Sequence, residues 1–163
     1  MILWTANFFL ISAKAIPAGD LRIAIAADLN AAGAASGSRA AGAGAPWTFA
    51  VKGVGRVVAA NMASRARVAE LDIDGDGAAD LTLQLGPVIK GSALRDIAPF
   101  YDFNTFRDQI EFAKLGRAIN DRVFQKLTLP DGDLVGQNLT FTGALAVKAA
   151  ADPWLVTVIE VAR

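Results

Sequence analysis

The stretch WTFAVKGVGRVVAA, residues 47–60, alternates apolar and polar side chains over more positions than most strands span. One face of this predicted strand carries Phe49, Val51 and Val57, with two glycines between them. Glycine inside a strand weakens it and usually marks a bulge or a sharp bend. A long first strand that bends to join two faces of a small barrel needs such a feature. The stretch therefore predicts the opening strand of a barrel.

Beyond residue 60 the sequence patterns predict further strands and one helix. Periodicity predicts strands over 65–73, 80–86, 138–148 and 154–163, and an amphipathic helix of about six turns over 103–127. In the third strand Leu81, Leu83 and Leu85 point inward, whereas Thr82 and Gln84 point outward. The inward residues of the fourth strand are Leu139, Phe141, Leu145 and Val147. The last strand is apolar almost throughout, which predicts that it is covered on both sides.

The predicted helix has a start signal and a charge pattern. Asn104 is a candidate N-cap, and Phe103 before it is a candidate hydrophobic staple. Opposite charges stand four residues apart in two pairs, Arg107 with Glu111 and Arg117 with Asp121. These features favour a helix with one apolar face and one solvated face.

The order of three strands, a helix and two closing strands is that of an OB-fold, a five-stranded Greek-key barrel. The short Asp-Gly loop between the second and third strands favours an antiparallel hairpin. The sequence thus predicts a mainly β, α+β domain over residues 47–163, with the helix capping one end of the barrel. Residues 1–46 are predicted as an N-terminal extension, with a helix over 17–32 capped by Asp20 and a Gly/Ala-rich linker over 33–46.

The first residues of the chain are apolar but do not resemble a targeting segment. Residues 2–16 contain no unbroken apolar run near the ~20 residues that a spanning helix needs. They also lack the basic region that begins a signal peptide. We expect a strand or helix packed on the core, and an export signal, if the protein has one, would lie upstream of residue 1.

Composition narrows the chemistry that the chain can perform. Sixteen basic and 16 acidic residues give no net charge, which argues against nucleic acid as a main partner. Histidine and cysteine are both absent, which excludes a zinc site, a thiol nucleophile, haem ligation and a histidine-based triad. A hard cation bound by oxygen ligands is the cofactor that this composition accommodates most easily.

The segment DIDGDGAAD, residues 72–80, places four aspartates around two glycines. Its candidate metal ligands are Asp72, Asp74, Asp76, the Ala78 carbonyl and Asp80, at positions 1, 3, 5, 7 and 9 of a calcium-type loop. Leu83 stands where an EF-hand needs glutamate, and the spacing instead resembles the calcium-binding hairpins of integrin-type propeller repeats. A plain turn explains the central Asp-Gly residues but not Asp72 and Asp80. A structural calcium ion that clamps the hairpin is therefore favoured over a solvated turn.

A second polar group lies in the crossover between the third strand and the helix, residues 85–104. The candidate ligand-binding residues there are Lys90, Ser92, Arg95, Asp96 and Tyr101. The favoured alternative is that Arg95 pairs with Asp96 or Asp102 and staples the crossover, while Phe100 and Tyr101 plug the barrel end. Asp96 and Glu111 are also a conceivable carboxylate pair for a hydrolase.

Three runs of the sequence carry a family resemblance: APWTFAVKG, LQLGPVIKGSALRD and FNTFRDQIEFAKLGRAINDR. The chain resembles an uncharacterised bacterial family of predicted periplasmic lipoproteins, whose members carry runs such as G-P-V-I-R-G-T-A-L-R-D. The resemblance covers most of the chain and places Lys90, Arg95 and Asp96 on the family's polar crossover motif. It implies an association with sugar-type ABC uptake systems. The sequence departs from the family in having neither a signal nor a lipobox cysteine.

These observations lead to three hypotheses about function. The first is a non-enzymatic periplasmic binding or accessory module, whose partner is a small-molecule ligand or an ABC transporter component and which meets the membrane only through a lipid anchor that these residues do not carry. The second is an oligosaccharide or oligonucleotide binder that uses the usual OB-fold face and needs exposed aromatic side chains on its second and third strands. The third is a carboxylate-dependent hydrolase built around Asp96.

Overall fold

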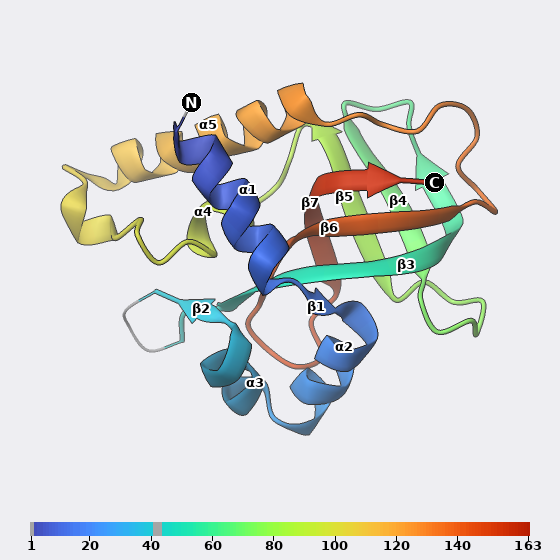
Figure 1. Ribbon diagram of the computed structural model, residues 1–163, viewed down its shortest axis with the longest axis horizontal. Coiled ribbons are helices and arrows are strands. Elements are labelled where there is room, and N and C mark those ends of the chain that lie inside the picture. The colour runs from blue at the N-terminus through green and yellow to red at the C-terminus, as the bar shows by residue number, and fades with distance from the viewer. Residues whose placement is uncertain (1, 41–43) are drawn as a thin grey trace.

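A computed structural model describes residues 2–40 and 44–163, and its centre is a closed five-stranded barrel (Figure 1). The barrel strands are β3 (Trp47–Asn61), β4 (Ala66–Asp72), β5 (Leu81–Pro87), β6 (Asn138–Val147) and β7 (Trp154–Ala162). Hydrogen bonds link them in the order β3-β4-β5-β7-β6 and then back to β3. Only the β5–β7 pair of the barrel is parallel. The predicted Greek-key order is confirmed.

Strand β3 belongs to two sides of the barrel because it bends in the middle. Its first part pairs with β6 from Trp47 to Arg56, and its second part pairs with β4 from Arg56 to Asn61, with a register shift after Val57. Gly55 lies at this bend, where a Cβ would come within 3.0 Å of the Asp72 carbonyl oxygen and of the Leu71 side chain. The absent side chain lets the two strands approach, as the glycine pattern predicts.

Two apolar clusters lie on the two faces of the barrel wall. The inner cluster includes Phe49, Leu83 and Val158, all at most 1% exposed. The outer cluster includes Ala50 of β3 and Ile159 of β7, which are covered by helices. The last strand is therefore buried on both faces, and the inward positions predicted for the third and fourth strands are confirmed.

Helices pack against this barrel in two groups, one over the outer cluster and one whose buried residues, such as Leu21 and Ile25, belong to the inner cluster (Figure 1). The first group is α1 (Ile2–Lys14), α4 (Ala93–Asp96) and α5 (Gln109–Lys126), and the second is α2 (Ala18–Ala27) and α3 (Leu29–Ser36). Two short strands, β1 (Ile16–Pro17) and β2 (Ser38–Arg39), pair with β3 beside them. Ile11 of α1 is fully buried in the outer cluster, so the apolar N-terminal stretch packs on the core as expected.

The N-terminal segment differs from its prediction in two places. The helix predicted over 17–32 is two helices, because Asp28 caps a second one; α2 begins at Ala18 with Pro17 at the N-cap, so Asp20 is not the cap. The proline ring fixes φ at a value that suits a helix start, and Asp20 then lies in the first turn, where the helix dipole favours a negative charge. The linker predicted from residue 33 is wrong over its first part, because α3 continues to Ser36 and β2 follows.

Gly33 explains why this first part of the predicted linker is ordered. A Cβ on Gly33 would collide with the indole ring of Trp47, so the absent side chain makes room for the ring against α3. Asn30 accepts a hydrogen bond from Trp47 Nε1 at 3.1 Å. Residues 41–43 of the predicted linker lie outside the described residues, and the division of the chain at residue 46 stays a prediction.

The long helix starts later than its sequence pattern suggests. Asp108 is the N-cap of α5 and accepts a hydrogen bond from the Glu111 backbone N–H at 2.9 Å. A separate 3-10 turn, η1 (Phe103–Thr105), precedes it, so Asn104 does not cap the helix. The rings of Phe103 and Phe106 both pack on Phe112, and this contact folds the predicted first turn back onto the helix.

Candidate functional site: the aspartate hairpin and the crossover

The aspartate segment is the tight connection between β4 and β5. The two strands pair up to Leu71 and Leu81, and the Asp80 backbone N–H donates to the Leu71 carbonyl oxygen at 2.8 Å. Gly75 and Gly77 have φ values of 84° and 86°, a region that residues with side chains rarely enter. The sequence therefore forms the predicted antiparallel hairpin, with its four aspartates on one short loop.

Asp72 is the structural centre of this hairpin. Its Oδ1 accepts hydrogen bonds from the backbone N–H groups of Asp74 and Gly75 at 3.1 and 2.7 Å, and its Oδ2 accepts one from Gly77 at 2.8 Å. The bond from Gly77 contributes most to holding the pKa of Asp72 below its usual value, and the other two backbone bonds act in the same direction. Asp72 is thus an ionised side chain that shapes the loop around itself.

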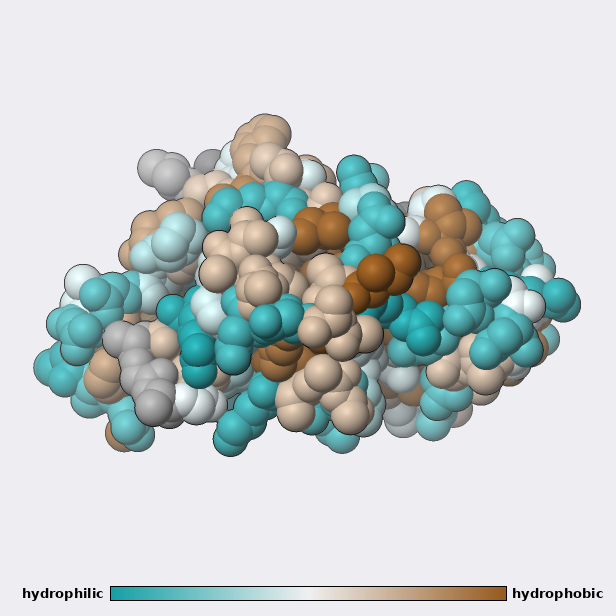
Figure 2. All heavy atoms as spheres, turned by 90° about the horizontal axis from the view of Figure 1, so that it is seen from below, coloured by the Kyte–Doolittle hydropathy of each residue, from teal (hydrophilic) through white to brown (hydrophobic). Residues whose placement is uncertain are grey.

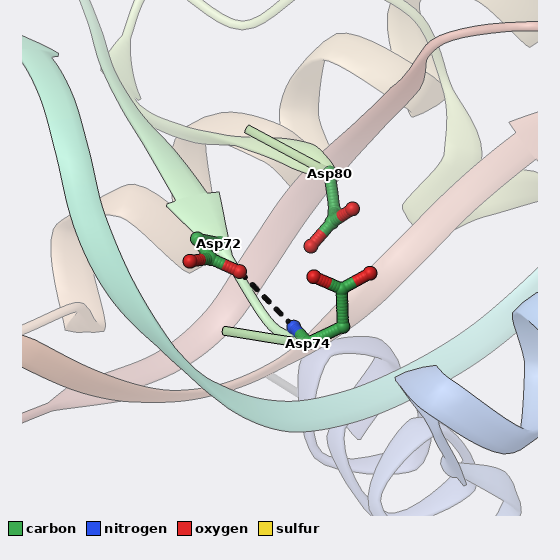
Figure 3. A group of neighbouring side chains, drawn as sticks. All are labelled: Asp72, Asp74 and Asp80. Carbon is green, nitrogen blue, oxygen red and sulfur yellow. Dashed lines mark hydrogen bonds between the residues drawn. The ribbon is translucent and has the colours of Figure 1, made fainter. Parts of the chain in front are cut away.

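Three of the predicted metal ligands come together in space. Asp72, Asp74 and Asp80 each turn a carboxylate toward the other two (Figure 3), and one oxygen from each lies within 4.8 Å of the others. Oxygen ligands of a calcium ion, at 2.3 to 2.6 Å from the ion, can be separated by about this distance. Asp76 does not belong to this group, and its Oδ1 accepts a hydrogen bond from the Ala78 backbone N–H at 2.8 Å. The Ala78 carbonyl stays a predicted ligand.

A cation from a distant segment already lies beside these carboxylates. Arg22 of α2 places Nη1 3.2 Å from Asp74 Oδ2 and 2.9 Å from Asp80 Oδ1. The Asp80 side chain is only 6% exposed, so an unpaired charge there would be costly. The sequence pattern gives no sign of Arg22, because it lies in a helix 52 residues before Asp74 with no motif of its own.

The crossover residues, by contrast, bind one another. The Arg95 guanidinium donates to Asp96 Oδ1 at 2.7 Å, to Ser92 Oγ at 3.0 Å and to the Phe112 carbonyl oxygen at 2.9 Å. It also lies over the Phe112 ring, 3.7 Å from the ring centre. Ser92 Oγ donates to Asp96 Oδ2 at 2.7 Å. Ser92, Arg95 and Asp96 therefore form one cluster that fastens the crossover to α5.

The other two crossover candidates lie apart from this cluster. The backbone of Lys90 is bound on both sides by the Gln84 side chain, which also donates to Thr157 Oγ1 at 3.0 Å. Gln84 is therefore buried beneath the crossover, and the prediction that it faces solvent is wrong. Tyr101 donates its hydroxyl to Asn7 Oδ1 of α1 at 3.0 Å, and burial raises the pKa of this hydroxyl.

The structure does not support the two alternative functions, an oligosaccharide or oligonucleotide binder and a hydrolase with a carboxylate pair. Strands β4 and β5 carry no aromatic residue, whereas bases bind such a face by stacking on aromatic rings. Asp96 is bound to Arg95, and Glu111 forms an ion pair with Arg107 at 3.0 Å. Each carboxylate of the suggested hydrolase pair thus already has a local partner.

The fold has a counterpart among solved structures. An OB-fold protein from Thermotoga maritima matches with a TM-score of 0.74 over 98% of this chain and 93% of that chain, at 14% sequence identity. At this identity the likeness concerns the fold alone, and it confirms the predicted OB-fold barrel. No curated protein matches the sequence.

The sequence also matches a family model along almost its full length. The family is described as "Predicted periplasmic lipoprotein (DUF2291)", and the match extends over residues 3–162. Among the described residues, no helix has both the length and the apolar character needed to cross a membrane. The chain belongs to this predicted periplasmic lipoprotein family, as its GPVIKGSALRD and FNTFRDQIEFA runs indicate.

Proposed function

We propose that the protein is a non-enzymatic binding or accessory module of the periplasm, built on an OB-fold barrel. The observation that carries the proposal is the family match over residues 3–162, joined to a fold that binds ligands in many proteins. The internal pairing of Ser92, Arg95 and Asp96 supports a structural role for the most polar part of the family motif. Ligand contact then falls to other surfaces of the barrel.

The proposed partner is a small-molecule ligand or a component of a sugar-type ABC uptake system. Chemical cross-linking in intact cells, followed by purification of the protein, tests the transporter partner directly. Substrate-binding or membrane components of an ABC system should be recovered with the wild-type protein. A thermal-shift screen of sugars and small metabolites tests the ligand. If neither experiment yields a specific partner, the binding or accessory function is wrong.

We further propose that the hairpin binds a structural calcium ion through Asp72, Asp74 and Asp80. The close approach of their carboxylate oxygens supports this site. Hydrogen bonds from the backbone do not use up the acceptor capacity of a carboxylate, because each carboxylate offers about four lone-pair positions. The ion would take over the charge compensation that Arg22 provides. Sites of this extracellular type bind calcium with Kd values of about 10⁻⁴ to 10⁻³ M.

Calorimetry and thermal melting, with calcium or with EGTA, test this calcium site. Calcium should raise the Tm of the wild-type protein, and Asp74→Ala should abolish the increase. Arg22→Gln removes the competing cation and should therefore tighten calcium binding. Asp131→Asn is the matched control, since it removes an exposed carboxylate from a different turn. If calcium has no effect up to about millimolar concentrations, the hairpin is a charged turn in which Arg22 pairs with Asp74 and Asp80.

A further inference from the structure

A groove opens on the outside of the barrel where β3 bends. It has a volume of about 700 Å³ and is lined by the bend of β3, one side of the aspartate hairpin, Val135 and Gly136 before β6, and Asn138 at the start of β6. A second hollow of about 410 Å³ lies between α2 and the hairpin, and Ile73 lines both hollows. The larger hollow is in the size range of small-molecule sites.

Apolar side chains gather along these two hollows. Val54, Val135 and Ile23 are 57%, 49% and 73% exposed, and they are three of the eight large apolar side chains that the described residues expose. Figure 2 shows the face that carries α2, with brown apolar side chains gathered in its centre and right half. Exposed apolar side chains gathered around a hollow mark a binding surface more often than scattered apolar residues do.

The polar groups of the larger groove have unused donors. Arg56 and Asn138 stand opposite each other on β3 and β6 and both line the groove. Neither side chain has a hydrogen-bond or ion-pair partner among the described residues. Asp72 also lines the groove and stands opposite Arg56 in the β3–β4 pairing, but three backbone N–H groups already fill most of the acceptor positions of its carboxylate. The groove thus offers the five N–H donors of a guanidinium, against the Asn138 amide oxygen and one open position on Asp72 as acceptors.

We propose that this groove binds a small amphipathic carboxylate, with its hydrocarbon part on Val54, Ile73 and Val135 and its carboxylate on Arg56. This deepens the small-ligand function proposed above and rests on it. A guanidinium binds a carboxylate through two parallel hydrogen bonds, which gives such a contact both strength and direction. Asn138 is placed to donate a further hydrogen bond to the same carboxylate.

The acidic hairpin beside the groove forms no ion pair with Arg56. Asp74 and Asp80 are paired with Arg22, and Asp72 is bound by backbone N–H groups. No ion pair links Arg56 to any carboxylate of the described residues. Arg56 is therefore the charged group of the groove that still lacks a partner.

Three probes with the same tail and different head groups test the proposal: octanoate, octanol and octylammonium. NMR titration in calcium-free buffer gives both the affinity and the location of each probe. Octanoate should bind about tenfold more tightly than octanol, the ratio expected for one charge-assisted contact, and octylammonium should bind most weakly. The largest shifts should fall on residues 54–57 and 135–138.

Two substitutions separate the groove from general electrostatics. Arg56→Gln should weaken octanoate about tenfold and leave octanol unchanged. Lys52→Gln is the matched control, because Lys52 is an exposed cation on the same face of β3 but does not line the groove. Val54→Ser should weaken all three probes. All three side chains are exposed, and melting curves verify that each variant folds.

Equal binding of octanoate and octylammonium, or equal effects of Arg56→Gln and Lys52→Gln, would overturn the groove assignment. Shifts confined to another surface would overturn it as well. If these results accompany a ligand from the thermal-shift screen or a cross-linked transporter component, the proposed function survives without this site. If probes bind the groove as expected but no cellular partner is found, the transporter association fails while the site stands.

Discussion

The aspartate hairpin and the crossover both carry charged side chains next to the barrel, but these charges are compensated in different ways. The crossover carries both signs of charge within a few residues, and Arg95 finds Asp96 next to it in the chain. The hairpin carries a single sign, so its compensation comes from backbone N–H groups and from Arg22 of a distant helix. A segment that carries both charges can thus form its ion pairs internally, whereas a segment that carries one charge needs backbone donors or a cation from another part of the chain.

This difference has a functional meaning. The polar groups of the crossover donate to and accept from one another and α5, so few donors and acceptors remain for a ligand. The hairpin keeps an exposed edge at Asp74, whose side chain is 47% exposed, beside a tethered cation. The hairpin is therefore the region whose behaviour should respond to ions in solution, and the crossover is the region that should not.

The largest expected effect is the loss of the Arg95 cluster. Arg95→Met removes three donated hydrogen bonds from a side chain that is only 12% exposed and leaves Asp96 without its cation. We expect the free energy of unfolding to fall by about 2–3 kcal/mol, less than the ~3–5 kcal/mol for breaking a fully buried pair, because the Asp96 side chain is 33% exposed. Equilibrium urea denaturation measures it. Arg117→Met, at an exposed position of α5, is the control, and equal losses in both variants would contradict the role of the cluster.

Asp72→Asn should have the next largest effect on stability. The size of this effect should depend on pH, whereas that of the control Asp131→Asn should not. Because the folded state lowers the pKa of Asp72, its carboxylate stabilises the fold above the unfolded pKa of about 3.9. That stabilisation is lost as the pH falls through the lower folded-state pKa. The difference in urea midpoint between wild type and Asp72→Asn should therefore be large at neutral pH and shrink in acid.

Asp131→Asn gives the comparison for this pH dependence, since Asp131 is exposed on another turn. Its midpoint difference should be small at every pH. A difference for Asp72→Asn that stays constant down to strongly acid solution would mean that the three backbone bonds do not depend on the ionised carboxylate.

Arg22→Met should have a smaller effect that depends on salt. The Arg22 side chain is 39% exposed, so solvent screens much of its attraction to the hairpin. We expect a loss of about 0.5–1 kcal/mol at low ionic strength, and most of it should disappear near 1 M salt, where the screening length is about 3 Å. Urea denaturation at the two salt concentrations measures this change. The loss for Arg95→Met should change much less with salt, and parallel salt dependence of the two variants would contradict the comparison.

The smallest expected effect belongs to the exposed helix pair. Arg107→Gln breaks an ion pair with Glu111 in which the Arg107 side chain is 80% exposed. The free energy of unfolding should fall by no more than about 0.5 kcal/mol. Thermal melting is sensitive enough to set this limit. If the loss were as large as that of Arg22→Met, the stability contributed by these ion pairs would not decrease with their exposure, contrary to our expectation.

Much of the fold could be predicted because strands leave a repeated signal. The inward leucines of β5 and the glycines of β3 follow from period-two patterning, and both predictions are confirmed. The helix start could not be fixed, because Asp102, Asn104 and Asp108 are all suitable caps within seven residues. The stacking of Phe103 and Phe106 on Phe112 decided among them, and such contacts leave no local pattern.

In the candidate site, too, the contacts between distant segments could not be predicted from the sequence. The aspartate spacing predicts a cluster of carboxylates, and the structure brings together Asp72, Asp74 and Asp80. Gln84 was misplaced because a glutamine that alternates with leucines resembles a surface residue, whereas the crossover covers it. The groove at Arg56 had no sequence signal, since it is formed by three segments that are far apart in the chain.

The sequence by itself determined the order of the strands along the chain, the bend of β3 and the negative charge of the hairpin, because each of these depends on residues that are close together in the chain. Only the tertiary structure decided that Arg22 pairs with two aspartates of the hairpin, that Gln84 is buried and that Arg56 has no ion-pair partner among the described residues. The physical reason is that ion pairs and packing between distant segments depend on where the folded backbone places them. Such contacts have no spacing in the sequence by which they could be recognised.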